Sequence, residues 1–229
     1  MGRSTVARER LVIKLSGKVF GDSPGEIRKH AAMLGDVSKT VQPVVVAGGG
    51  KVARHYIDLA RDLGSDEATL DMIGIEVSRL NAKLMIAALG DKAYSAVPAD
   101  LEAVASAAES GKIVVTGGLH PGQSTNATAA LIAEKVRASK FLNATDVEGI
   151  YDTDPNKNKN AKLFKEITVK KCLELLVSEN SAAGSYDLMD IVALKVIQRS
   201  RIPTVVLKSD VAAIRNAIDG RAAGTRIVF

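Results

Sequence analysis

The chain has 229 residues, of which 46% are hydrophobic and 25% charged, as in a globular protein long enough for one large α/β domain or two small lobes. Its net charge of +5 would favour anionic ligands, but lysines and arginines are interleaved with acidic residues, so we expect most of the excess to form a solvated surface. Aromatic residues make up 3% and Trp is absent, which argues against base stacking and hence against a nucleic-acid partner.

The single cysteine, Cys172, excludes a disulfide framework. It has no neighbouring Cys or His cluster that would form a zinc site, so we expect a buried structural thiol. No apolar run reaches the length of a membrane span, and residues 1–10 lack a hydrophobic signal core. We therefore expect a cytoplasmic protein without a membrane partner, with a flexible lead-in at residues 1–10.

Strand-like and helical segments alternate along the chain. Runs of β-branched and apolar residues predict strands at residues 11–15, 44–47, 94–97, 113–115, 140–144, 163–167, 205–207 and 227–229. Apolar residues at steps of three and four predict helices at residues 24–40, 52–63, 66–89, 101–108, from about 126 onward, 169–177, 188–199 and 211–218. The alternation predicts an α/β fold with a largely parallel sheet covered on both faces.

Local signals mark some of the connections. Ser23 and Glu26 predict a capping box, with Pro24 at the first helical position. The polar run at residues 152–162 predicts a solvated loop or a short hairpin, and residues 180–185 predict a flexible connection.

Glycine turns follow three of the predicted strands, at residues 16–17, 48–50 and 117–118. Because each turn follows a strand and precedes a helix, we expect all three to gather at the carboxyl edge of the sheet, where ligands of such folds bind. Either Ser124 or Thr125 can cap the helix after the third turn, whose free N–H groups would suit a phosphate. An ordinary strand-to-helix loop with a capping hydroxyl is the alternative.

The glycine turns have two functional interpretations, a dinucleotide site and a phosphoryl-transfer site. Residues 48–53 satisfy the GxGxxA pattern of a dinucleotide fingerprint, with Asp71 roughly 20 residues further on, which would fit an NAD-linked oxidoreductase. Against this, Lys14, Lys18 and Arg54 stand at the edges of the turns, as phosphoryl transfer requires to neutralise charge on the transferred group. The P-loop pattern GxxxxGK[ST] is absent from the sequence.

Six motifs occur in an order that is similar to a known family: KLSGK at 14–18, VAGGGKVAR at 46–54, LDMIGIEVSRLNA at 70–82, VTGGLHPGQST at 115–125, ATDVEGIYDTDP at 144–155 and YDLMDIVALKV at 186–196. Together they resemble the archaeal type of uridylate (UMP) kinase of the amino acid kinase family, from about residue 11 to the C-terminus. The SRLNA segment separates this branch from acetylglutamate and carbamate kinases.

The resemblance implies a three-layer α/β/α sandwich around a largely parallel central sheet, formed by residues 11–229 as a single domain. Residues 11–140 would form the phosphate-acceptor half and residues 141–229 the ATP half. The implied reaction is phosphorylation of UMP by ATP in pyrimidine nucleotide biosynthesis, with Mg²⁺ carried by ATP and no metal site in the protein. The family also forms homohexamers, and the long helix at 66–89 would suit a subunit contact.

The resemblance also implies site residues. UMP would contact Gly49, Asp71, Leu119, His120, Pro121, Gly122, Gln123, Ser124 and Thr125. ATP would contact Lys14, Leu15, Ser16, Gly17, Lys18, Gly50, Arg54, Thr145, Asp146, Tyr151 and Asp154. Catalysis would involve Lys14, Lys18 and Asp190, the last resembling an aspartate that organises the lysines or magnesium. Asp71 would accept hydrogen bonds from the ribose, and Gly50 and Arg54 would lie between the two phosphates.

The chain departs from the family pattern at two places. Asp146 stands where the family usually has Asn, and Ile191–Val192 replaces Pro–Leu after Asp190. Structural roles are alternatives for three candidates: Tyr151 can pack, Asp154 can cap a turn before Pro155, and Asp71 can be a helix-surface carboxylate.

Three alternative functions also stay open. One is a kinase of the same fold that acts on acetylglutamate, carbamate or isopentenyl phosphate. Another is the NAD-linked oxidoreductase, and the third is a regulatory subunit that binds UMP without turnover.

Overall fold

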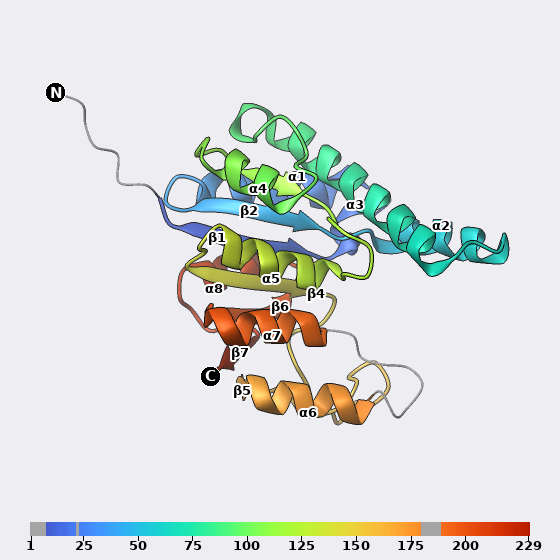
Figure 1. Ribbon diagram of the computed structural model, residues 1–229. Helices are drawn as coiled ribbons and strands as arrows, with labels where there is room; N and C mark the ends of the chain where they lie inside the picture. The colour runs from blue at the N-terminus through green and yellow to red at the C-terminus, as the bar shows by residue number, and fades with distance from the viewer. Residues whose placement is uncertain (1–7, 22, 180–188) are drawn as a thin grey trace.

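The computed structural model describes residues 8–21, 23–179 and 189–229, and this part of the chain contains one seven-stranded sheet (Figure 1). Its strands, in sheet order, are β3 (Val114–Thr116), β2 (Gln42–Ala47), β1 (Arg10–Leu15), β4 (Lys140–Thr145), β6 (Thr204–Lys208), β7 (Thr225–Val228) and β5 (Glu166–Thr168). Neighbouring strands run parallel except for β6 and β7, which are antiparallel. The carboxyl ends of β1, β2, β3 and β4 therefore meet at one edge of the sheet.

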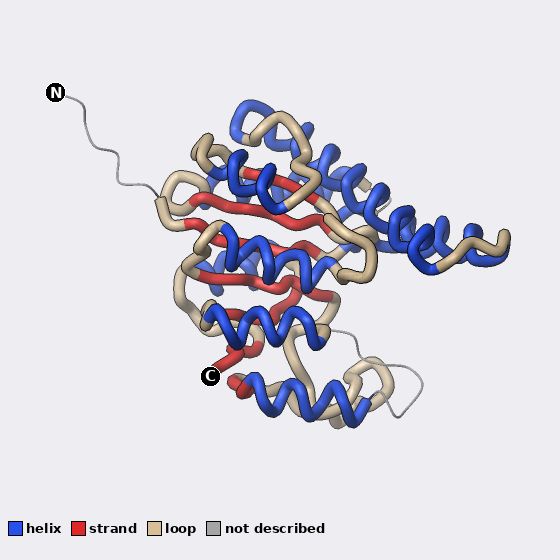
Figure 2. The backbone as a smooth tube through the Cα atoms, viewed as in Figure 1, coloured by secondary structure: helices blue, strands red, loops and turns tan. Residues whose placement is uncertain are grey.

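Helices cover both faces of the sheet (Figure 2). One face carries α4 (Leu101–Ala108), α5 (Thr125–Lys135), α6 (Val169–Glu179) and α7 (Ile191–Ser200). The other face carries α1 (Pro24–Val37), α3 (Glu67–Leu89) and α8 (Val211–Ile218). The three-layer α/β/α arrangement expected from the sequence is therefore confirmed.

The alternation of side chains along β1 explains the two layers. Leu11, Ile13 and Leu15 lie in the core with α1, α3 and α8, whereas Val12 lies in the core with α4 to α7. Both sets are buried, as expected for a central parallel strand whose successive side chains point to opposite faces.

A helical hairpin extends beyond the carboxyl ends of β1 and β2 (Figure 1). It consists of α2 (Gly50–Asp62) and α3, which pack against each other. The root of this hairpin lies at the carboxyl edge of the sheet, because α2 begins directly after the turn that follows β2.

Side-chain caps set most of the helix starts. In the described part of the chain, a side-chain oxygen of the preceding residue accepts a backbone N–H of the first turn in seven α-helices, and the capping residues are Ser23, Asp66, Asp100, Ser124, Thr168, Asp190 and Asp210. Ser124, rather than Thr125, therefore caps α5. Ser23 accepts from the Gly25 N–H while Glu26 pairs with Lys29, so only the serine half of the predicted capping box forms.

Two predicted strands are wrong in part. Residues 94–97 form no strand, because pairing in this segment is limited to an isolated bridge between Ala93 and Ile113 and Pro98 soon follows. Residues 163–167 contain only the start of β5, and Leu163 instead forms an antiparallel bridge with Tyr151. This bridge closes residues 152–162 as a short hairpin, which the polar composition allowed.

Other boundaries shift by a few residues. Helix α1 ends at Val37 rather than near residue 40, and α7 begins at Ile191, whereas the predicted start at 188 and the predicted connection at 180–185 lie outside the described residues. Cys172 is buried, and this burial raises the pKa of its thiol to about 12. Within the described ranges, no helix combines the length and apolar character that would let it cross a bilayer.

Candidate functional site

The first two glycine turns are in direct backbone contact. A Cβ atom at Gly17 would lie 2.1 Å from the Gly50 backbone nitrogen, and one at Gly50 would lie 2.7 Å from the Gly17 carbonyl oxygen. Gly50 also has a φ of +68°, a conformation that other residues rarely adopt. Glycine is therefore required at both positions, and the expected meeting of these turns at the sheet edge is confirmed.

The third glycine turn lies against helix α3. The Gly118 N–H donates to Ser78 Oγ at 2.7 Å, and Ser78 in turn donates to the Ile75 carbonyl at 2.7 Å. A Cβ atom at Gly117 would lie 2.5 Å from Ser78 Oγ and 2.6 Å from the Arg79 nitrogen. The glycine pair thus permits the loop after β3 to touch the helix backbone.

The same turn of α3 holds two loops. Arg79 Nε donates to the Gly118 carbonyl at 3.1 Å, and Asn81 Nδ2 donates to the Gly48 carbonyl at 2.8 Å. Ser78 and Asn81 are buried. The SRLNA motif does not by itself indicate a role for Ser78, Arg79 and Asn81, and the available signal is that they are polar residues between apolar positions of the helix.

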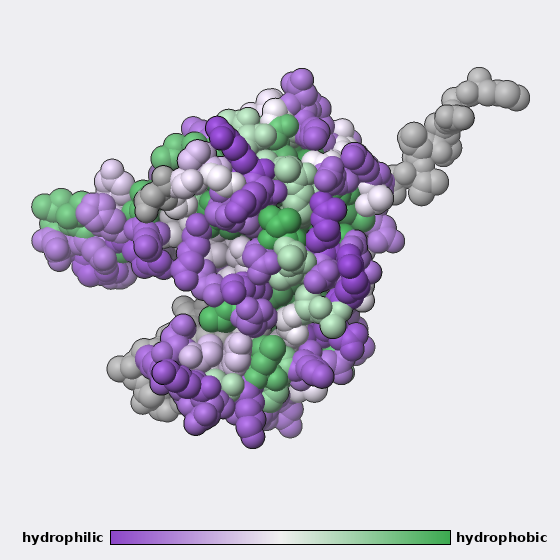
Figure 3. Space-filling view, turned by 180° about the vertical axis from the view of Figure 1, so that it is seen from behind, coloured by the Kyte–Doolittle hydropathy of each residue, from purple (hydrophilic) through white to green (hydrophobic). Residues whose placement is uncertain are grey.

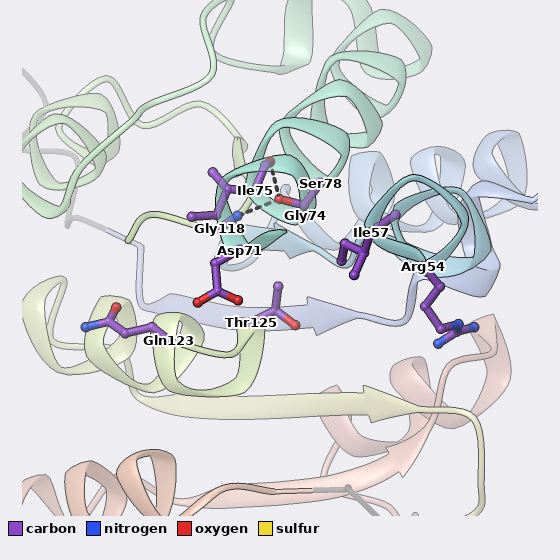
Figure 4. A pocket seen from close by; sticks show the side chains of 12 residues that line it. Arg54, Ile57, Asp71, Gly74, Ile75, Ser78, Gly118, Gln123 and Thr125 are labelled. Atoms are coloured by element: carbon purple, nitrogen blue, oxygen red, sulfur yellow. Dashed lines mark hydrogen bonds between the residues drawn. The ribbon is translucent and has the colours of Figure 1, made fainter. Parts of the chain in front are cut away.

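A pocket of about 230 Å³ opens where these elements meet (Figure 4). It is lined by Gly49, Gly50, Ala53, Arg54, Ile57, Asp71, Gly74, Ile75, Ser78, Gly118, Gln123 and Thr125. Its walls are formed by α2, by α3 and by the loop and first residue of α5, so segments far apart in the sequence share one cavity.

The pocket contains part of the expected acceptor set. Gly49, Asp71, Gln123 and Thr125 line it, and the Gly122 N–H donates to Asp71 Oδ2 at 2.6 Å. This bond ties the loop before α5 to helix α3. The remaining residues of that set lie outside its lining: Leu119 is buried, His120, Pro121 and Gly122 are exposed, and Ser124 caps α5.

The start of α2 is suited to an anion. Unlike the seven capped helices, α2 has no side-chain hydrogen bond at its N-cap residue, Gly49. The exposed Arg54 lies one turn further along the helix and lines the same pocket. The start of α2, which no side chain caps, and the Arg54 guanidinium therefore border one pocket, where the helix dipole and the positive charge both favour an anion.

A second polar cluster lies at the carboxyl ends of β1 and β4. Ser16 Oγ donates to Asp146 Oδ1, and Lys18 Nζ lies 2.9 Å from Asp146 Oδ2. Burial acts to raise the pKa of Asp146, but the Ser16 hydroxyl, the Lys18 ammonium and the nearby charge of Lys14 outweigh it, so the pKa lies below its ordinary value. The sequence resemblance implied that these residues all contact ATP, but it did not indicate that they contact one another.

Asp190 lies between the starts of two helices. Its Oδ1 accepts the Ala193 N–H at 2.7 Å and so caps α7, while its Oδ2 accepts a hydrogen bond from Ser124 Oγ at the start of α5. Among the described residues its side-chain hydrogen bonds go to these two partners and not to a lysine. The expected role of Asp190 in organising lysines or magnesium stays a prediction.

The remaining candidates lie beyond β4. Thr145 is buried and its Oγ1 accepts the Val147 N–H at 3.3 Å. Tyr151 is half-buried in its bridge to Leu163. Asp154 Oδ1 accepts the Asn156 N–H at 2.9 Å and so caps a turn, which is the structural role that Pro155 suggested.

Gly117→Ala tests the close approach of the loop to α3. We expect the substitution to lower the free energy of unfolding by about 1–3 kcal/mol, because the new methyl group overlaps Ser78 and the helix backbone. Urea unfolding measures this value. Gly25→Ala is the matched control, since its Cβ would meet Ser23 Oγ at an ordinary 3.4 Å, and equal effects of the two substitutions would contradict the explanation.

The lowered pKa of Asp146 predicts acid sensitivity. A carboxyl with a folded-state pKa below its unfolded-state value stabilises the fold above the unfolded-state pKa, and this contribution is lost as the pH falls through the folded-state pKa. Below about pH 4 we therefore expect the Tm of the wild type to fall more steeply than that of Asp146→Asn. Parallel Tm curves of the two proteins would refute the expectation.

The chain is similar to proteins of known families. Residues 9–208 match the model of the amino acid kinase family. A uridylate kinase of Methanobrevibacter smithii is 41% identical over 204 residues, which are 89% of this chain and 91% of that protein. A uridylate kinase of Methanothermobacter thermautotrophicus is 41% identical over 222 residues, which are 96% of this chain and 99% of that protein.

A solved structure agrees with these relatives. The crystal structure of uridylate kinase from Archaeoglobus fulgidus superposes with a TM-score of 0.86 at 37% identity, covering 95% of this chain and 99% of that one. These relatives do not support the dinucleotide interpretation of residues 48–53. On the match over residues 9–208 and this likeness, the chain belongs to the amino acid kinase family.

Proposed function

We propose that the protein transfers the γ-phosphoryl group of ATP to UMP, giving ADP and UDP in pyrimidine nucleotide biosynthesis. The observation that carries this proposal is the convergence of the glycine turns on a pocket that pairs the uncapped start of α2 and Arg54 with the carboxylate of Asp71. Such a pocket offers donors to a phosphate and an acceptor to a sugar hydroxyl. The relatives named uridylate kinases support this choice of acceptor.

UMP would occupy the pocket between α3 and the start of α5. Its phosphate would face Gly49 and Arg54, and Asp71 would accept from the ribose hydroxyls while Oδ2 also holds the Gly122 N–H. The loop from Leu119 to Thr125 would close on uracil and sugar.

ATP would bind at the carboxyl ends of β1 and β4, on the side of residues 141–229. Lys14 and Lys18 would lie beside the transferred group, and Gly50 and Arg54 between the two phosphates. Because in-line phosphoryl transfer requires little covalent work from side chains, the protein acts by positioning the phosphates and by stabilising charge on the oxygens.

We propose that Mg²⁺ reaches the site on ATP. No group of three His, Cys, Asp or Glu side chains that could hold an ion occurs among residues 8–21, 23–179 and 189–229, so a cation cage made only by the protein does not fit the described part of the chain. When bound with the nucleotide, Mg²⁺ neutralises charge on the phosphate oxygens.

We also propose that the protein is a cytoplasmic homohexamer. The support within the chain is a set of exposed apolar side chains on the α2–α3 hairpin: Val52, Tyr56, Leu59, Leu63, Met72, Leu80 and Leu84. Exposed apolar side chains gathered on two packed helices are typical of a surface that contacts a partner.

An acceptor comparison tests the reaction. ADP release coupled to an NADH-linked assay is measured with UMP, CMP, dUMP, acetylglutamate, carbamate and isopentenyl phosphate. We expect the highest kcat/KM with UMP, and faster turnover of another acceptor would overturn the assignment. Binding of UMP without turnover would indicate a regulatory subunit, and binding of NAD(H) in a separate titration would favour the oxidoreductase.

The assembly is tested by light scattering. We expect the wild type to have a mass of about six chains and the variant Leu80→Asp/Leu84→Asp to form smaller species, because two buried charges would disrupt an apolar contact. Phe229→Asp is the control, since Phe229 is an exposed apolar residue outside the hairpin. A hexamer that survives the double substitution would place the contact elsewhere.

A further inference from the structure

Asp146 holds both of the polar side chains that flank Gly17. Its Oδ1 accepts from the Ser16 hydroxyl and its Oδ2 faces Lys18 Nζ at 2.9 Å. The lysine side chain is 57% exposed and the aspartate 39%, so the pair lies at the surface of the site and within reach of a ligand. Both carboxylate oxygens therefore point to the turn after β1.

The topology explains why this pair is formed at the site. Strands β1 and β4 are parallel neighbours, so the turn that follows β1 and the loop that follows β4 leave the sheet side by side. Gly17 is packed against Gly50, the first residue of α2 and part of the pocket lining. Asp146 thus holds Ser16 and Lys18, while Gly17 between them contacts the glycine that lines the pocket.

From this arrangement we propose that Asp146 is a positioning residue, which holds the Lys18 ammonium beside the path of the transferred phosphoryl group rather than contacting the nucleotide itself. This role rests on the proposed kinase function. Among the described residues, the side-chain hydrogen bonds of Asp190 go to Ser124 and Ala193, so they do not hold Lys18.

The charge and the flexibility of the Lys18 side chain explain why a positioning residue would be useful. A lysine has a flexible four-carbon stem, and fixing it removes side-chain entropy before the ligand arrives. An Asn, the residue that the family usually has here, could bond to Ser16 but would not attract an ammonium by charge. The lowered pKa of Asp146 keeps its carboxylate ionised at neutral pH, so the pair persists under the conditions of the reaction.

The Asp146 carboxylate also has an unfavourable effect on nucleotide binding. A fixed negative charge beside the phosphate path repels ATP, so removing it should strengthen nucleotide binding while it releases Lys18. A positioning role therefore predicts a separation of the two kinetic constants. With Asp146→Asn we expect kcat to fall about tenfold and KM for ATP to fall or stay unchanged, as for a loss confined to the transition state.

A double-mutant cycle tests the path of the effect. Asp146→Asn, Lys18→Met and the double variant are compared with the wild type in steady-state phosphorylation of UMP. If Asp146 acts through Lys18, its substitution in the Lys18→Met background changes kcat by less than about twofold. Multiplication of the two single effects in the double variant, or an unchanged kcat in Asp146→Asn, would overturn the proposal.

An NMR measurement, which needs no turnover, reports directly on the hydrogen bonding of the Lys18 ammonium. In ¹H–¹⁵N spectra an ammonium gives a cross-peak while hydrogen bonding slows exchange of its protons with water, and Lys18→Met assigns the peak. We expect Asp146→Asn to remove this peak and Glu148→Gln to leave it in place. Glu148 is the matched control, because it lies in the same loop as Asp146 and its carboxylate forms a similar ion pair, at 3.1 Å from Lys208 Nζ.

The outcomes separate the two proposals. Persistence of the Lys18 peak in Asp146→Asn would refute the positioning role whatever the substrate. If the wild type phosphorylates a different acceptor, the UMP assignment fails and the same cycle with that acceptor decides the role of Asp146.

Discussion

The contact between the backbones of Gly17 and Gly50 fixes the geometry on which the rest of the site depends. No side chain separates the two turns, so the end of β1 and the start of α2 are held at van der Waals distance. The uncapped N–H groups of α2 and the Ser16–Lys18 segment consequently lie next to each other. A donor and an acceptor phosphate can then meet over one point of the sheet edge.

Helix α3 extends this constraint to the third turn. Through Ser78, Arg79 and Asn81 it bonds to the loops after β2 and β3, and through Asp71 it bonds to the loop before α5. The helix therefore sets the distance between the side of the pocket formed by α2 and the side formed by the start of α5. Its packing in the core with β1 and α1 makes that distance a property of the fold.

Much of this arrangement could be predicted from local sequence. Apolar runs and helical spacing located β1 and α8 within one residue, and Gly49, Asp71, Gln123 and Thr125 line a common pocket as their motifs suggested. A strand was predicted at residues 94–97, but none forms there. A short apolar run does not show whether a neighbouring strand is available for pairing.

The contacts that could not be predicted join residues far apart in the chain. Ser16 and Asp146 are 130 positions apart, and Ser124 and Asp190 are 66 apart. Spacing along one helix or strand cannot reveal such pairs, because they depend on which strands become neighbours in the sheet. For the same reason the sequence showed Ser78 and Asn81 as polar residues of α3 but not the loops that they hold.

The helical turn at residues 78–81 limits how this chain can diverge. Three of its four positions hold the loops of the site, whereas Leu80 lies on the outer side and is 54% exposed. Substitution at the three inner positions would move a loop, whereas substitution at Leu80 would alter only the apolar outer surface of the hairpin. A change in the proposed subunit contact at this position can therefore leave the shape of the pocket behind it unchanged.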